Sequence, residues 1–196
     1  MNLQFLGDAL DHWKGALFAS LREAKAIRNF AVDPMASDIE RWHQEDFNLL
    51  ARLLQIAPSQ VIGHQESLKH RPAYFGEIAH AGDLFLDPDT GVATGRITEA
   101  HISPIEIGQL LDGANDRLLI IYQHARSMAV ARRVNQVMNT VKDVIGAFSA
   151  CSYESGTVAM LFLSRVRVRT SQVAEHFEAL LGRHAAGRIR RFESRR

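Results

Sequence analysis

The chain has 196 residues, of which 46% are hydrophobic and 23% are charged, and its formal net charge is +1. This composition is typical of one globular domain and excludes disordered or collagen-like chains. No apolar run reaches the roughly 18 to 20 residues of a membrane span. Asp8, Asp11 and His12 near the N-terminus argue against a secretory signal. Cys151 is the only cysteine, which excludes an internal disulfide and is typical of a cytoplasmic protein.

The near-zero net charge hides an uneven distribution. Residues 1–164 carry 14 Lys and Arg against 19 Asp and Glu, a balance of −5, whereas residues 165–196 carry 9 against 3, a balance of +6. We therefore divide the chain into an α/β domain over 1–182 and a basic C-terminal tail over 183–196. Arginine suits bidentate phosphate contacts, so the tail is a candidate for binding nucleic acid, and a solvated terminus is the alternative. The expected contacts are Arg183, Arg188, Arg190 and Arg191.

The first half of the chain predicts two helices and two short strands. Asp8 can cap the first helix, whose apolar residues recur at spacings of three and four. An apolar run stopped by Pro34 predicts a buried strand. Ser37 and Glu40 have capping-box spacing and predict the start of the second helix. The expected elements are a helix over 8–24, a strand over 29–34, a helix over 37–56 and a short strand over 60–63.

In the second half, helices alternate with continuous apolar strands. This alternation predicts a mainly parallel sheet covered on both faces by helices. Two adjacent apolar runs joined around Gly156 predict an antiparallel hairpin near the C-terminus, and Gly146 and Gly182 can end the preceding and following helices. The expected elements are helices over 74–81, 103–111, 130–144 and 173–180, strands over 83–88 and 117–122, and a hairpin over 148–163. We therefore expect a single-domain Rossmann-like fold.

Polar side chains follow three of the predicted strands, and ligands of open α/β sheets bind at the carboxyl ends of strands. Asp33 follows the first strand, Asp87 and Asp89 follow the second, and His124 follows the third. Proline after Asp87 favours an extended backbone that directs this carboxylate out of the sheet edge. Two carboxylates can orient an amine or share a proton, although the same residues suit a plain turn. We interpret Asp87, Asp89 and His124 as candidate catalytic residues, with His124 as general acid or base.

A metal site is an alternative reading of the same turn. Glu99 and His101 follow it and could join Asp87 and Asp89 around Mg²⁺ or Mn²⁺. The protein would then be a metal-dependent phosphoesterase or nuclease.

Two short motifs resemble a known family. Gly7-Asp8-Ala9-Leu10-Asp11-His12-Trp13-Lys14 resembles the Gly-Asn-x-x-Asp-x-x-Lys-His segment of a ribosomal-RNA adenine methyltransferase family, the methyltransferase J group. Asp87-Pro88-Asp89-Thr90 stands where that family carries Asp-Pro-Pro-Tyr, and the helix, strand, helix and hairpin follow in the same order. The resemblance implies a class I methyltransferase-like fold, S-adenosylmethionine as cofactor, Asp87 at the catalytic position and Lys14 at the amino-terminal lysine. Lys14 and Asp33 are then expected to contact the cofactor.

The chain departs from that family at two places. Residues 32–38 hold no glycine where the family has a glycine-rich cofactor loop, and Thr90 replaces the aromatic residue that stacks on the target adenine. Two hypotheses therefore stand beside the metal-dependent one. The first is a methyltransferase-like protein that acts on or binds nucleic acid, in which Asp87 accepts a hydrogen bond from a target amino group. The other is a non-catalytic binding module of the same fold.

Overall fold

The computed structural model describes residues 1–64, 66–76, 78, 80 and 82–193. Within this part of the chain, a six-stranded sheet has the order β1-β2-β5-β7-β6-β8. Its strands are β1 (Ala31–Asp33), β2 (Leu84–Leu86), β5 (Leu119–His124), β7 (Val158–Ser164), β6 (Ser149–Ser155) and β8 (Ile189–Glu193). A small second sheet joins β3 (Gly91–Val92) to β4 (His101–Ile102). The helices are α1 (Ala9–Glu23), α2 (Gln44–Leu53), α3 (Arg71–Gly76), α4 (Pro104–Asp112), α5 (Val130–Ile145) and α6 (Arg167–Leu181).

The large sheet is mixed. β1, β2 and β5 run parallel, and the register places Val32 beside Phe85 and Phe85 beside Ile120. β7 is antiparallel to both β5 and β6, and β8 is antiparallel to β6. Four of the six strands, β1, β2, β5 and β6, therefore point in the same direction. The expected α/β class, with a mostly parallel mixed sheet, is confirmed.

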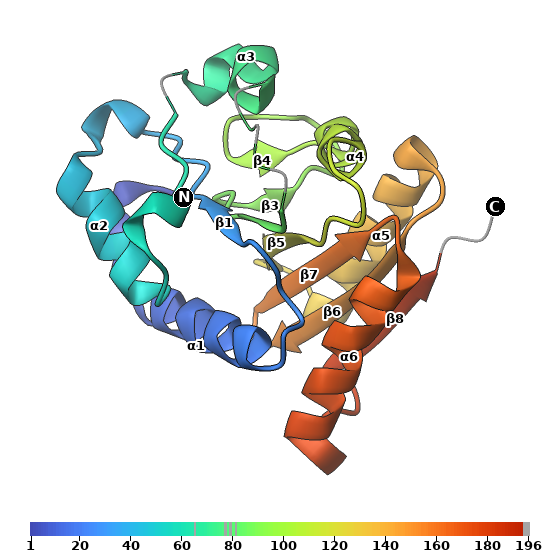
Figure 1. The fold of residues 1–196 in the computed structure, drawn as a ribbon. Coiled ribbons are helices and arrows are strands. Elements are labelled where there is room, and N and C mark those ends of the chain that lie inside the picture. Colours follow the sequence, from blue (N-terminus) through green and yellow to red (C-terminus); the bar gives the residue numbers. More distant parts are fainter. Residues whose placement is uncertain (65, 77, 79, 81, 194–196) are drawn as a thin grey trace.

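Helices cover both faces of this sheet (Figure 1). Side chains alternate along a strand, so Phe85 and Ile120 face α1, α2 and α6, whereas Leu84, Leu86 and Ile121 face α4 and α5. Burial on both faces explains why these strands are continuous apolar runs in the sequence. In the described residues, no helix is long and apolar enough to cross a membrane.

Three predicted elements between residues 37 and 81 differ from the structure. α2 begins after His43, whose backbone N–H donates to Asp46 at 2.8 Å, so the predicted capping box at Ser37 is wrong. Residues 60–63 form only an isolated bridge, between Val61 and Val32. α3 begins at Arg71 and ends at residue 76, and residues 77, 79 and 81 of the predicted helix over 74–81 lie outside the described residues.

The segment expected as a C-terminal tail contains a strand. β8 pairs with β6 and places Ile189 beside Tyr153 and Phe192 beside Ala150. Ile189 packs against the core on one face of the sheet and Phe192 against the core on the other. These two apolar side chains attach the segment to the sheet, although arginines outnumber them in the sequence.

Candidate ligand-binding site at the ends of β2 and β5

A cavity of about 870 Å³ lies at the carboxyl ends of β2 and β5. This is the edge at which open α/β sheets bind ligands, and the volume is that of a small-molecule site. Its walls come from the N-terminal segment, the first turns of α1, the loops after β2 and β5, and the loop before β4. The lining side chains that matter below are Phe5, Lys14, Asp87, Tyr122, His124 and Arg126.

A buried ion-pair cluster lines this cavity. Lys14 Nζ lies 2.7 Å from Asp87 Oδ2 and 3.0 Å from Asp11 Oδ1. Asp11 and Lys14 share one face of α1 because they are three residues apart. Burial acts to lower the pKa of Lys14, but the Asp87 and Asp11 carboxylates outweigh it and raise this pKa. Lys14 is therefore an ammonium ion at neutral pH and holds Asp87 in place as its counter-ion.

Asp87 keeps one oxygen available beside this cluster. Within the described part of the chain, its Oδ2 accepts from Lys14 and its Oδ1 has no hydrogen-bond partner. Asp87 lines the cavity, so this second oxygen can accept a hydrogen bond from a ligand.

The Tyr122 ring lies against the same cluster. Lys14 Nζ is 4.5 Å from the centre of the ring, a cation–π distance. Burial raises the pKa of Tyr122, and the carboxylates of Asp87, Asp8 and Asp11 raise it further. The phenol therefore keeps its proton, and its oxygen is buried without a hydrogen-bond partner among the described residues. An unpaired buried hydroxyl costs about 1–3 kcal/mol, so it is a feature that needs a functional explanation.

His124 is the third predicted residue that the structure brings to the cavity. Burial lowers the pKa of His124, and the positive charge of Arg126 adds to this effect. The imidazole is therefore neutral at pH 7 and can donate or accept a hydrogen bond. Its ring lies edge-on to that of Tyr122, with 4.8 Å between the ring centres.

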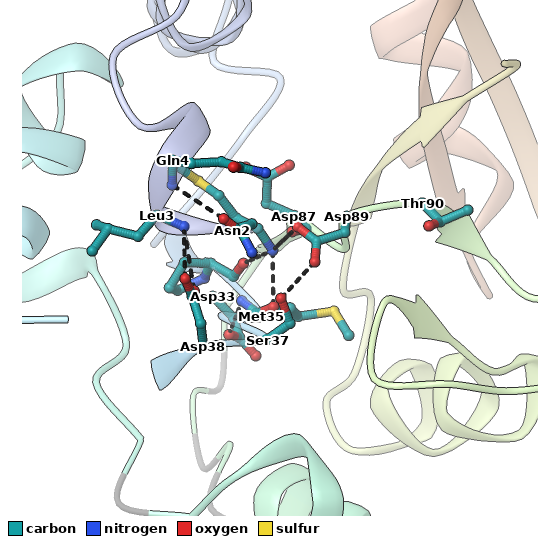
Figure 2. Close-up of polar contacts among 12 residues, drawn as sticks. Asn2, Leu3, Gln4, Asp33, Met35, Ser37, Asp38, Asp87, Asp89 and Thr90 are labelled. Atoms are coloured by element: carbon teal, nitrogen blue, oxygen red, sulfur yellow. Dashed lines mark hydrogen bonds and ion pairs between the residues drawn. The ribbon is translucent and has the colours of Figure 1, made fainter. Parts of the chain in front are cut away.

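The other acid of the turn, Asp89, contacts the N-terminal amine (Figure 2). The Met1 amine donates to two carbonyl oxygens of the loop after β1 at 2.8 Å each and to Asp87 O at 2.6 Å. It lies 3.3 Å from Asp89 Oδ1, and Ser37 Oγ donates to Asp89 Oδ2 at 2.6 Å. Burial lowers the pKa of this amine despite the two carboxylates. Asp89 thus links the loops after β1 and β2.

Asp33, expected to contact a cofactor, instead contacts other residues in the protein interior. Its Oδ1 accepts from Tyr74 Oη at 2.6 Å and from Met35 N at 2.8 Å. Its Oδ2 lies 3.1 Å from His64 Nε2. The residue is fully buried and is not among the described residues that line the cavity.

The end of β1 therefore does not fit S-adenosylmethionine. The cofactor of the family that the two motifs resemble needs a glycine-rich loop whose backbone can come close to it. Here Met35 is fully buried with a φ of 43°, and the Met1 amine bonds to the carbonyl oxygens of the same loop. Met35 and the Met1 amine therefore fill the space at the end of β1 that the cofactor would need.

Gln123, one of the polar residues at the end of β5, holds the acidic turn against that strand. Its side-chain oxygen accepts from Val92 N at 2.9 Å, and its side-chain nitrogen donates to Thr90 O at 3.0 Å and His124 O at 2.7 Å. Gly91 has a φ of 107°, and a Cβ there would lie 2.4 Å from the Gln123 carboxamide. The glycine of the turn is thus required by both its backbone conformation and this close approach.

The structure does not assemble the predicted metal site. Asp87 contacts the Lys14 ammonium, which already supplies positive charge, and Asp89 contacts the Met1 amine. His101 Nδ1 lies 2.8 Å from Thr98 Oγ1. In the part of the chain that the structure describes, no group of three or more His, Cys, Asp or Glu could hold a metal ion.

The four C-terminal arginines are not among the described residues that line the cavity. Arg190 contacts the buried Glu154, and Arg191 donates to Glu178 at 2.7 Å. Arg183 and Arg188 are exposed. Two residues that the sequence did not single out, Phe5 and Arg126, do line the cavity. Phe5 is 54% exposed, and no periodic pattern could reveal it.

Together, these observations describe an α/β protein with a mixed sheet and a cavity at the ends of two parallel strands. A scan against protein-family models finds no match for this chain, and a search of the curated proteins finds none either.

Proposed function

We propose that this chain is a methyltransferase-like protein that binds single-stranded RNA by holding an unstacked base in the cavity, and that it does so without S-adenosylmethionine. The observation that carries the proposal is the contact between Lys14 and Asp87. These residues belong to the two segments that resemble the adenine methyltransferases, and they meet at the cavity although 73 positions separate them. The sheet order, in which β7 lies between β5 and β6, agrees with the closing hairpin of that layout.

The cavity chemistry suits the edge of an adenine or cytosine. Both bases carry an exocyclic amino group that donates hydrogen bonds. The available oxygen of Asp87 is an acceptor for such a group, and the 2.7 Å contact with Lys14 orients the carboxylate. This is the role that the resemblance predicts for Asp87, here used for recognition.

Phe5 supplies a stacking surface at the same cavity. Proteins that read single-stranded RNA stack unpaired bases on aromatic side chains. Phe5 lies at the end of a short 3₁₀ helix, Leu3–Phe5, and its ring is more than half exposed. Its exposed apolar side chain is available to pack against the flat face of a base at the cavity.

Methyl transfer is left out of the proposal because the end of β1 does not fit the cofactor. Asp33, the residue expected to contact it, is sealed by Tyr74, Met35 and His64. Of the hypotheses from the sequence, a methyltransferase-like protein that binds nucleic acid but has lost its cofactor site agrees best with these contacts.

Fluorescence anisotropy with labelled oligoribonucleotides tests the proposal. We expect the wild-type chain to bind an adenine-rich single strand at low salt and to bind a strand of abasic sites more weakly. Phe5→Ala should weaken binding to the adenine-rich strand by about 5- to 160-fold, the range of one lost stacking contact. Ile105→Ala is the matched control, because Ile105 is 60% exposed on α4 and is not among the described residues lining the cavity.

Two results would contradict the proposal. One is equal affinity of the wild type and Phe5→Ala for the adenine-rich strand. The other is a calorimetric titration in which S-adenosylmethionine binds tightly, because that would require an open site at the end of β1.

A further inference from the structure

We infer that the RNA backbone runs along a strip of arginines beside the cavity, formed by Arg126, Arg132 and Arg133, instead of along the C-terminal arginines. This inference rests on the proposed function and specifies its phosphate-binding surface. The strip spans the loop after β5 and the first turn of α5.

The strip lies in a segment without acidic residues. Between Asp116 and Asp143 the sequence has Lys and Arg but neither Asp nor Glu. Arg126 and Arg132 are exposed and Arg133 is half-buried. The strip therefore carries a local charge of +3 that its own segment does not balance.

Two of the three arginines contact the chain between residues 90 and 94, of which Thr90 lines the cavity. Arg126 lines the cavity and donates to Thr90 Oγ1 at 3.3 Å. Arg133 donates to Thr94 Oγ1 at 2.7 Å and to Val92 O at 2.9 Å. Residues 90–94 thus hold both arginine side chains in place beside the cavity.

None of the three arginines has an acidic partner in the part of the chain that the structure describes. Arg126 donates to one neutral acceptor and Arg133 to three, the third being Gln136 Oε1 at 3.3 Å. A guanidinium has five N–H donors, so both keep donors available for phosphate oxygens. Their charge reaches His101, whose pKa is lowered by burial first and then by Arg133 and Arg126. The strip is therefore a region of uncompensated positive charge next to the pocket.

The C-terminal arginines differ in this respect. Arg190 and Arg191 are paired with Glu154 and Glu178, and Arg167 is paired with Glu193. Phosphate contacts there would compete with existing ion pairs. Only Arg183 and Arg188 of the predicted four have no carboxylate partner in the described chain.

The start of α5 adds to the attraction. Its N-cap residue, Ala129, makes no side-chain cap, and its first turn contains no acidic residue. No acidic side chain therefore offsets the positive end of the helix dipole, which lies at the same turn as Arg132 and Arg133. The three arginines carry the inference, and the helix terminus reinforces it.

The geometry of the strip also restricts the partner to a single strand. A base that enters the cavity must leave its stack, so its own phosphates lie at the cavity wall, where Arg126 is placed. The strip then leads the backbone away along residues 90–94. A continuous duplex would present no free base to the cavity.

Salt dependence of RNA affinity separates the two surfaces. The test variant is Arg126→Gln/Arg132→Gln, and the matched control is Arg183→Gln/Arg188→Gln, since each removes two exposed guanidiniums without an ion pair. For a single strand, two lost phosphate contacts lower the slope of log affinity against log salt by about 1.4, or about 25-fold in affinity at 0.1 M salt. We expect this loss in the test variant and wild-type values in the control, with both variants melting like the wild type.

Three outcomes would overturn the inference. Loss of affinity in the control alone would assign the backbone to the C-terminal arginines. Wild-type affinity and slope in both variants, together with weaker binding by Phe5→Ala, would reject the strip and leave the proposed function intact. Absence of RNA binding by the wild type would reject both.

Discussion

Lys14 Nζ and Asp87 Oδ2 are 2.7 Å apart, and this contact joins the first helix of the chain to the end of the second strand. Both side chains are almost fully buried. A buried ion pair is weak evidence for stability, because desolvation of the two charges offsets their attraction. Its position at the cavity wall, where it orients Asp87, is a stronger reason for the protein to keep it.

Removal of Lys14 should be costly because two buried carboxylates would lose their counter-ion. We expect Lys14→Met to lower the free energy of unfolding by about 3–5 kcal/mol in urea titrations. Arg28→Met is the control, since Arg28 and Asp116 form an ion pair in which both side chains are 53% exposed, and such pairs contribute less than about 1 kcal/mol. Equal losses in the two variants would show that burial of the cluster has no energetic consequence.

Gly91→Ala should destabilise the protein, whereas Gly95→Ala should not. At Gly91 the φ of 107° and the 2.4 Å approach to Gln123 both oppose a side chain, but nothing lies within 4 Å of a Cβ at Gly95. We expect a loss of about 2–4 kcal/mol for Gly91→Ala from strain and overpacking together. Thermal unfolding of the two variants measures the difference, and similar melting temperatures would contradict the close packing of the turn on β5.

Two tyrosine hydroxyls should have opposite effects on stability. Tyr122→Phe removes a buried hydroxyl that has no hydrogen-bond partner in the described chain, and we expect the free energy of unfolding to rise by about 1 kcal/mol. Tyr74→Phe removes a hydroxyl that donates to Asp33 at 2.6 Å, and we expect a loss of about 1–2 kcal/mol. A loss in Tyr122→Phe would show that its hydroxyl already has a partner in the folded protein.

Stability should fall with acid through the two histidines at the cavity. Burial lowers the pKa values of His101 and His124 from the ordinary value of 6.5, so below pH 6.5 the unfolded chain binds more protons than the folded one. The free energy of unfolding should therefore decrease as pH falls from 6.5 toward the lowered pKa values. His124→Gln should make that decrease smaller in urea titrations between pH 7.5 and 5, and His12→Gln, at an exposed position, should leave it unchanged.

Elements set by local chemistry could be predicted from the sequence. Asp8 accepts hydrogen bonds from the backbone N–H of Leu10 and Asp11 and starts α1 as expected. Ser103 likewise caps α4, and the apolar runs around residues 85 and 120 form buried strands. Caps and periodicity depend on residues a few positions apart, so tertiary packing did not change them. Ser37 is the exception, because Asp89, 52 positions away, bonds its hydroxyl.

The candidate site depended on contacts that no local pattern contains. Asp33 and Asp87 both end a buried strand and both precede a proline, so the sequence treats them alike. Tyr74, His64 and the Met1 amine close the end of β1, whereas Asp87 keeps an oxygen at the cavity.

The same limit applies to the arginines. Counting them identified the C-terminal segment as the most basic part of the chain, yet Glu154, Glu178 and Glu193 neutralise three of its arginines. The sequence by itself determined the α/β class, the starts of α1 and α4 and the acidic turn. The tertiary structure decided which acid faces the cavity and which cations remain unpaired, because burial and charge compensation are set by neighbours that lie far apart along the chain.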